Sequence, residues 1–247
     1  MEEMLEFVSG VLHNEVYNEE KYEEDMVLIN SLEPPPPIKL NRDDVYIRSV
    51  RLTGDAINSY YGRFRTDDLP RLLELTNGVS CLIGHNRNTA GIARYFGGKI
   101  VEHSFYNRIT GKKEKGRFIV PKIYWMRNHS GAEDLKINLD GGIYHSFSIG
   151  YWYKMATCNI CGNDIRLCEH IPGKIYNGEL AFFWYDDIID VVEGSIVYSG
   201  SHPGTGVHSY VSGRLISGIN ESRKIYFKRT NRLKVINSGK EVLFYKA

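Results

Sequence analysis

Hydroxyl, imidazole and carboxylate groups occur in three short segments of the chain where nucleophilic catalysis could use them. His85 follows an apolar stretch, and Glu193 interrupts another. Ser146 and Ser148 are two positions apart and precede Gly150. In serine hydrolases an imidazole takes the proton of the attacking hydroxyl, and a carboxylate orients that imidazole. Each residue also has a structural explanation, because a histidine at a strand end commonly makes only structural hydrogen bonds. Spacing alone therefore leaves catalysis and structure open.

A second chemically active group has the spacing C-x2-C-x6-C-x-H and consists of Cys158, Cys161, Cys168 and His170. The two-residue gap, followed by Gly162, lets one tight turn direct two thiolates at a single ion, and the second pair completes a tetrahedron. Four protein ligands leave no position open for water, so the site would be structural. Zinc is the predicted metal, iron is less favoured, and incidental thiols are the alternative.

Zinc knuckles also bind nucleic acid, which is the alternative function of this segment. Within it only Arg166 is basic, whereas Asp164 and Glu169 would repel phosphate. Three of the four cysteines fall within this short segment, which suits a metal better than a disulfide framework and favours a reducing compartment. Cys81 is then left as an ordinary strand residue.

The formal net charge of +1 is the sum of two opposite contributions. Residues 1–33 hold ten acidic side chains against Lys21, a net charge of −9, so the remainder carries +10. Residues 4–12 have apolar positions at helical spacing, which favours a short amphipathic helix. The four prolines from Pro34 to Pro37 impose an extended spacer. The sequence thus predicts an acidic arm over 1–33 and a proline-rich linker over 34–40. The arm is interpreted as a solvated tail, a docking peptide or a removable pro-segment.

Export and membrane insertion are not expected from the sequence. Acidic residues stand at the start, where a secretory signal carries basic ones. The most apolar stretch, 180–192, contains three aspartates, so it falls short of the about 20 apolar residues that a membrane span needs.

From Val45 onward the sequence consists of short β-rich runs separated by Gly, Asn and Asp. These runs are 45–52, 79–85, 116–126, 141–153, 178–185, 191–198 and 224–229. Alternating apolar and polar residues favour half-buried strands of a largely antiparallel sheet or barrel. One helix is predicted over 66–75, ending near Gly78, and a second over 131–139, closed by Gly141 and Gly142. The predicted class is α+β, mainly β. Residues 41–213 would form one domain with the knuckle at 156–172, and 214–247 a basic C-terminal segment.

Three segments occur in an order that matches a known family: Leu82-Ile83-Gly84-His85, Phe147-Ser148-Ile149-Gly150, and Val192-Glu193-Gly194-Ser195-Ile196-Val197 followed by Ser201-His202-Pro203-Gly204. They resemble the "lxxH", "SiGf" and "EvSlVxxpAnp" segments of the prohead (capsid maturation) serine proteases of tailed phages. The resemblance covers roughly residues 45–210. The chain departs from the pattern at Gly194 and in the stretch Gly200-Ser201-His202-Pro203.

The resemblance implies an antiparallel β-barrel with flanking helices, of the type that this family shares with herpesvirus assemblins, and with a small zinc-binding loop inserted. By position, His85 would be the general base, Ser148 the nucleophile and Glu193 the third catalytic residue. Ser146 stays the alternative nucleophile. His103 and His145 are fallback third residues, because assemblins use a second histidine. Backbone amides between Gly194 and Gly200 are candidates for the oxyanion hole.

The function implied is a prohead maturation serine endopeptidase that cleaves scaffold and major capsid proteins inside the assembling prohead, in the host cytoplasm. Structural Zn²⁺ is its expected cofactor. Assemblins are active as dimers, so the resemblance leaves a homodimer possible, although nothing in the sequence identifies a dimer surface. Neither a membrane nor a nucleic-acid partner is expected. Two alternatives remain: an inactive virion structural or scaffold-binding protein with the same barrel, and a zinc-dependent nucleic-acid-binding protein.

Overall fold

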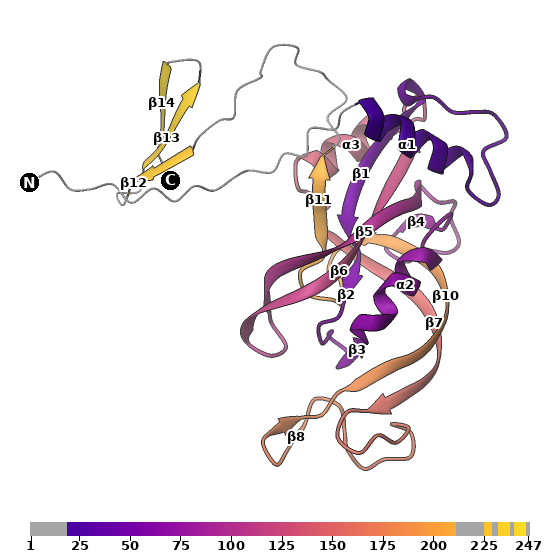
Figure 1. Cartoon of the computed structure of the whole chain (residues 1–247), viewed down its shortest axis with the longest axis vertical. Helices are drawn as coiled ribbons and strands as arrows, with labels where there is room; N and C mark the ends of the chain where they lie inside the picture. The colour runs from indigo at the N-terminus through magenta and orange to yellow at the C-terminus, as the bar shows by residue number, and fades with distance from the viewer. Residues whose placement is uncertain (1–18, 211–224, 229–231, 238–239, 246–247) are drawn as a thin grey trace, which may run out of the picture. The chain divides into compact units, whose positions relative to one another are not determined.

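The computed structural model describes residues 19–210, 225–228, 232–237 and 240–245. The larger of two compact units lies within Tyr17–Val211 (Figure 1). In the other unit, three short strands pair antiparallel in the order β12 (Ile225–Lys228), β13 (Arg232–Asn237), β14 (Lys240–Tyr245). The helix predicted over 4–12 lies outside the described residues, as does part of the basic segment 214–247.

The larger unit is organised around one sheet of nine strands. Its hydrogen-bonded order is β11-β1-β6-β5-β4-β10-β3, with β2 also paired to β6 and β7 to β10. Most ladders are antiparallel, but β10 runs parallel to β3 and to β4. The strands are β1 (Val45–Arg51), β2 (Thr53–Gly54), β3 (Gly62–Phe64), β4 (Ser80–Ile83), β5 (Ala93–Asn107), β6 (Lys112–Met126), β7 (Ser146–Cys158), β10 (Phe183–Val197) and β11 (Gly206–Tyr210).

The mainly β, α+β class predicted from the sequence is confirmed. The sheet ends at β11 on one side, and on the other β7 lies along the free edge of β10. Within the described strands no ladder joins β11 to β7, so no closed barrel is found.

Two helices pack into the main core of the sheet. Helix α2 (Leu69–Leu75) follows a 3-10 turn, η2 (Thr66–Asp68), and buries Leu69 and Leu72. This agrees with the predicted helix over 66–75. The first three residues of the predicted range form the 3-10 turn, in which the Thr66 hydroxyl donates a hydrogen bond to Asp55 Oδ2 at 2.8 Å.

Helix α3 (Ala132–Asp140) matches the second predicted helix and buries Ala132, Leu135 and Leu139. It is attached to β1 by Arg48, whose Nε and Nη2 donate to the two carboxylate oxygens of Asp140 at 2.7 Å each. Arg48 is buried, so this two-pronged ion pair satisfies a charge that would otherwise be costly to remove from water.

Helix α1 (Glu19–Asn30) belongs to the same unit as the sheet. Tyr22, Met26 and Ile29 repeat at helical spacing and pack against Val45, Ile47, Phe96 and Tyr124 in a second apolar cluster. Lys122 Nζ forms an ion pair with the buried Asp25. The sequence predicted a boundary between the acidic arm and the body at the prolines. In the structure Pro34–Pro37 instead connects α1 to η1 (Arg42–Asp44) and β1 within one unit, because the acidic helix has an apolar face of its own.

The remaining segment of the larger unit projects from the ends of β7 and β10. It contains the cysteine-rich loop and the two-stranded hairpin of β8 (Ile175–Tyr176) and β9 (Glu179–Leu180). No helix in the described part of the chain is long and apolar enough to span a membrane.

Candidate functional site

His85 stands at the end of β4 in an uncommon backbone conformation. Gly84 has φ +63° and His85 has φ +58°, so the chain turns sharply through two left-handed residues. A non-glycine residue in this region costs roughly 1–2 kcal/mol. The Gly84 N–H donates to the Ile196 carbonyl on β10 at 2.8 Å, which holds the turn against the neighbouring strand. The imidazole is 41% exposed, so it remains accessible to solvent.

Glu193 lies on β10 and contacts the imidazole directly. Its Oε1 is 2.6 Å from His85 Nδ1, and the carboxylate is only 3% exposed. An ionised carboxylate can only accept hydrogen bonds, so Nδ1 carries the proton and donates it. In the neutral imidazole Nε2 is then the unprotonated nitrogen. This is the tautomer that a general base needs, with the carboxylate on one side and a free acceptor on the other.

Ser195 joins the two residues from the same strand. Its hydroxyl donates to Glu193 Oε2 at 2.5 Å and accepts from the His85 backbone N–H at 3.2 Å. The side chain is fully buried, so it cannot itself meet a substrate. The sequence places Ser195 within the family-like motif but indicates no role for it. Its position two residues after Glu193 on one strand was the available signal, because such residues face the same side.

The pKa of Glu193 is lowered despite its burial. Burial alone raises it, but hydrogen bonds from His85 and Ser195, together with the positive charges of His85 and Arg87, lower it by more. The carboxylate is therefore held in the charged form.

Gly150 makes room for this carboxylate. It faces Glu193 across the β7–β10 ladder, and a Cβ at position 150 would lie 2.4 Å from Glu193 Oε1. Real Cβ atoms essentially never approach a neighbour so closely, so any larger residue would displace the Glu193 side chain. The presence of glycine at position 150, after the two serines, is thus explained by the space that the Glu193 side chain needs.

Ser148 lies on β7 directly opposite Ser195, one row along from the pair formed by Gly150 and Glu193. Opposite residues of an antiparallel ladder face the same side with Cβ atoms about 4.5–5.5 Å apart. Ser148 is 8% exposed, and within the described residues its hydroxyl makes no hydrogen bond to His85. Ser146 faces Val197, one row further from Glu193. The structure therefore brings His85 and Glu193 into contact and places Ser148 opposite Ser195, whose hydroxyl contacts both.

The other candidate residues lie elsewhere. His103 is on β5, with its ring edge against Phe118. His145 precedes β7, with Nδ1 3.2 Å from the Ile143 carbonyl. Gly194, a candidate for the oxyanion hole, faces the buried Tyr95, since a Cβ there would lie 2.5 Å from the Tyr95 ring.

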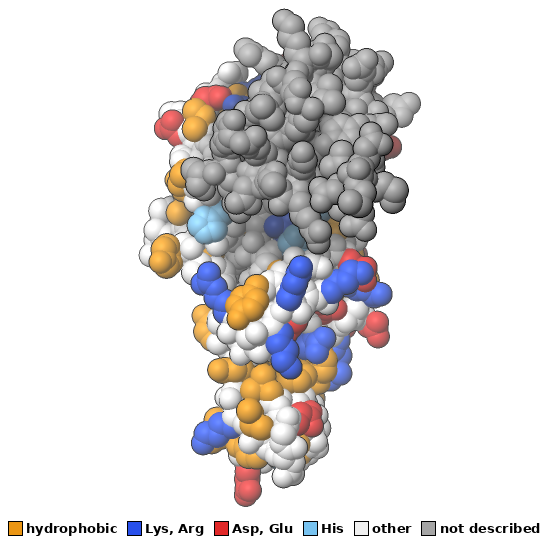
Figure 2. All heavy atoms as spheres, turned by 90° about the vertical axis from the view of Figure 1, so that its left-hand side faces the viewer, with side chains coloured by type: hydrophobic (Ala, Val, Ile, Leu, Met, Phe, Trp, Pro, Cys, Tyr) orange, Lys and Arg blue, Asp and Glu red, His pale blue; other side chains and the backbone are white. Residues whose placement is uncertain are grey.

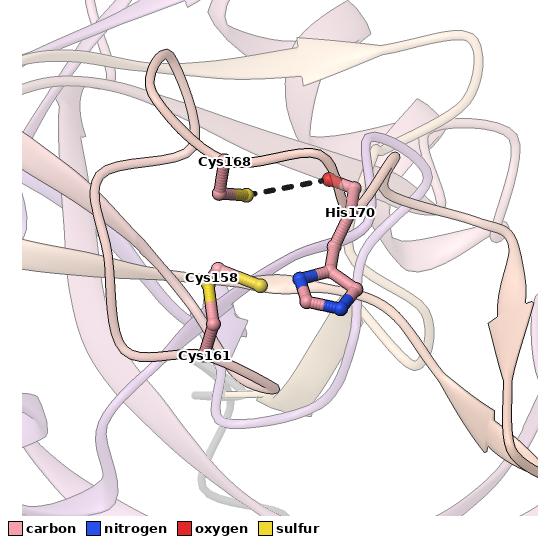
Figure 3. Close-up of side chains that lie close together, drawn as sticks. All are labelled: Cys158, Cys161, Cys168 and His170. Carbon is pink, nitrogen blue, oxygen red and sulfur yellow. Dashed lines mark hydrogen bonds between the residues drawn. The ribbon is translucent and has the colours of Figure 1, made fainter.

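The four predicted metal ligands come together at the tip of the projecting segment. One ligand atom from each of Cys158, Cys161, Cys168 and His170 lies within 4.8 Å of the others. Figure 3 shows the sulfur atoms and the imidazole gathered around one small space. Zinc–sulfur bonds of about 2.3 Å would place tetrahedral sulfur atoms about 3.8 Å apart, so small adjustments would close the site.

His170 supplies the observation that favours a metal at this cluster. Its Nδ1 is buried and has no hydrogen-bond partner in the described part of the chain. A buried polar atom without a partner is costly, and a metal ion would satisfy it. The ring is held edge-on by Tyr176, whose hydroxyl accepts from the Ile171 N–H at 3.0 Å.

The turn around Cys158 has the features expected of two adjacent thiolate ligands. Gly162 has φ +73°, and its N–H donates to the Cys158 carbonyl at 3.0 Å. Burial raises the pKa of the Cys158 thiol, but hydrogen bonds from the backbone N–H groups of Cys161 and Ile160 and from the thiols of Cys161 and Cys168 together lower it by more, so it ends below its usual range. All four cysteines are free, which leaves these thiols available for a metal.

No known family model matches the chain, and no curated protein or solved structure is significantly similar to it.

Proposed function

We propose that the protein is a serine endopeptidase of the prohead-maturation type, with a structural zinc site in a projecting loop. The observation that carries the proposal is the contact between His85 Nδ1 and Glu193 Oε1 at 2.6 Å, with a serine one strand away. The sequence resemblance supplies the family, its assemblin-like barrel and the scaffold and capsid substrates inside an assembling prohead.

In the proposed mechanism the Ser148 hydroxyl attacks the scissile peptide carbonyl. His85 Nε2 takes the hydroxyl proton and later gives it to the leaving amine. Glu193 holds the imidazole in the required tautomer and stabilises the positive charge that forms on it. The Ser148–His85 hydrogen bond forms when substrate binds, since catalytic hydrogen bonds commonly tighten only in the complex.

Ser148 is the proposed nucleophile in preference to Ser146. Ser148 shares a row with Ser195, whose hydroxyl contacts both His85 and Glu193. Ser146 is one row further away, beyond the reach of a short side chain without movement of the strand.

Zinc is the proposed metal because three thiolates and one imidazole form a closed donor set that suits it. Cys158, Cys161, Cys168 and His170 would hold the ion and stabilise the loop. They lie away from His85 in the fold, so the metal takes no part in the proposed peptide cleavage.

A fluorophosphonate probe tests the nucleophile without knowledge of the substrate. We expect covalent labelling at Ser148, mapped by mass spectrometry, and its loss in Ser148→Ala. Ser146→Ala is the matched control and should still be labelled. Cleavage of co-expressed scaffold or capsid protein should fall by roughly 10³-fold or more in Ser148→Ala. If wild type is neither labelled nor cleaves these proteins, the protease proposal is wrong, and the alternative of an inactive structural or scaffold-binding protein is favoured.

A further inference from the structure

The β5–β6 hairpin extends beyond the sheet as a ribbon of two strands. Residues 102–107 and 112–117 pair with each other and, in the described part of the chain, with no further strand. In Figure 1 the end of this hairpin projects from the left side of the larger unit.

One face of the ribbon is anchored to the body. Phe105 and Phe118 pack with Ala56 and Val120 in a separate apolar cluster, and the ring of His202 meets Phe118 edge-on at 5.2 Å. Near the turn, Asn107 Nδ2 donates to the Ile57 carbonyl at 3.3 Å, which also fixes the ribbon. The ribbon is therefore a positioned element.

The opposite face carries positive charge. Tyr106 faces Lys113, Ser104 faces Lys115, and Glu102 faces Arg117 across the ladder. All five cations at this end are exposed: Arg108, Lys112, Lys113, Lys115 and Arg117. Figure 2 views the molecule from the side on which the hairpin projects and shows Lys and Arg side chains gathered across the middle of the face.

Few acidic groups neutralise this face. Glu102 pairs with Lys115, and Glu114 is turned away toward Asn107 and Thr110, whose side chains donate to it. Among the described residues, Arg108, Lys112, Lys113 and Arg117 have no ion pair. On the outer face Lys113 and Arg117 are thus available to an external partner, and Lys115 has only an exposed pair with Glu102, which a phosphate can replace.

We propose that the outer face of this ribbon binds the phosphate backbone of double-stranded nucleic acid. A two-stranded β-ribbon fits the major groove of B-form DNA, which is about 12 Å wide. Lys113, Lys115 and Arg117 recur at every second residue, about 6.8 Å apart, along one edge of the face. Tyr106, 62% exposed, lies opposite Lys113 on the partner strand, where its hydroxyl can reach a phosphate.

An acidic protein partner is less favoured by the same face. Protein interfaces need a buried apolar centre with complementary shape. Among the described residues of this face, the large apolar side chains that are exposed are Tyr106 and, nearer the body, Ile100 at 36%. Phosphate recognition requires only accessible cations in a row. The near-zero net charge of the chain does not argue against this, because the binding charge is local.

Fluorescence anisotropy with a labelled 20-base-pair DNA duplex tests the proposal on the full chain. We expect wild type to bind with an affinity that falls steeply as salt rises. The triple variant Lys113→Ala/Lys115→Ala/Arg117→Ala should bind at least about tenfold more weakly and reduce the salt slope by up to about 2.7, since each lost phosphate contact lowers it by about 0.9.

The control is Arg71→Ala/Lys154→Ala/Lys174→Ala, which removes three exposed cations from other surfaces. It should bind like wild type. An equal loss of affinity in the control would mean that DNA is attracted by the surface charge in general, which would overturn the proposal. The absence of DNA binding by wild type would also overturn it. Tighter binding of polyglutamate than of DNA, lost in the first triple variant, would assign the face to an acidic protein. Ser148→Ala should bind DNA normally, which separates this proposal from the protease proposal.

Discussion

His85 and Glu193 meet across 108 positions of sequence, whereas the ligands of the cysteine cluster lie within the single stretch 158–170. The first pair depends on β4, β10 and β7 lying side by side, so it exists only when the sheet has formed. The second depends on one turn and one loop, and its folding can be driven by a metal ion. Substitutions, metal loss or a change of pH should therefore affect the stability of the two regions differently.

Removal of the proposed metal should have the largest effect, and that effect should stay local. Structural zinc contributes on the order of 10 kcal/mol to folding in small zinc domains. Cys161→Ser removes the exposed ligand, so we expect the metal content to fall to near zero. Amide hydrogen exchange should then rise over residues 158–182 and remain unchanged around His85 and Ser195.

Cys81→Ala is the matched control for the cysteine prediction, because Cys81 lies outside the cluster. It should retain its full metal content by mass spectrometry. Exchange that rises equally in β4 and in the loop would mean that the two regions fold as one unit, and the contrast between them would be lost.

Acid pH should lower the stability of the sheet that brings His85 and Glu193 together, here called the long-range region, because it protonates the buried His202. This residue is buried in the loop after β10, where Nε2 accepts from the Ala56 N–H at 3.2 Å and Nδ1 donates to the Pro203 carbonyl at 2.8 Å. Burial lowers the pKa of His202 to about 4. The ordinary value of about 6.5 applies to the unfolded chain, so the unfolded state takes up the proton first as pH falls.

The neutral, buried His202 therefore contributes its full share to the free energy of unfolding above about pH 6.5. This contribution is lost as pH falls toward about 4, which lowers the free energy of unfolding by roughly 3 kcal/mol. Urea denaturation at pH 7 and pH 4.5 measures it. His202→Gln should show a smaller pH dependence than wild type, and any acid release of metal occurs in both. Equal pH dependence in the two proteins would assign the acid sensitivity to other groups.

The local region could be predicted from the sequence, and much of the long-range region could not. The cluster's spacing alone indicated its four ligands. Position in family motifs indicated His85 and Glu193, but nothing in the sequence specified that Ser195 bridges them. Strand β5 was not predicted, because two adjacent glycines, Gly97 and Gly98, usually interrupt a strand. In the structure they form a bulge at which the β5–β6 register shifts. A bulge depends on the partner strand, so the sequence of one strand does not show it.

Charge gave a similar lesson at larger scale. The sequence predicted an acidic arm separated from a basic body by prolines, since ten acids precede Pro34. The apolar face of α1 was hidden among those acids, and only the cluster that receives it shows why the helix joins the sheet. Net charge likewise concealed the basic ribbon, because acidic side chains elsewhere cancel it.

Gly150→Ala should disrupt the long-range site without removing any polar group. The added methyl would overlap Glu193 Oε1 and push the carboxylate away from His85. In the proposed peptide cleavage, a displacement of about 1 Å in the catalytic group would cost roughly 10²-fold in rate. Cleavage kinetics measure this effect. Thermal unfolding should show a loss of stability that largely disappears in the Glu193→Ala background, where the colliding group is absent.

Ser195→Ala should have the smallest effect of the series. It leaves Glu193 Oε2 and the His85 N–H without their partner in a buried setting, which costs about 1–3 kcal/mol of stability. Because Glu193 keeps its contact with His85, we expect the cleavage rate to fall by only about tenfold. Ser80→Ala, an exposed serine of the adjacent β4, is the control and should change neither quantity. If Ser195→Ala lowers the rate as far as Ser148→Ala does, the bridging hydroxyl is part of the reaction itself, and the division of labour between the two serines must be redrawn.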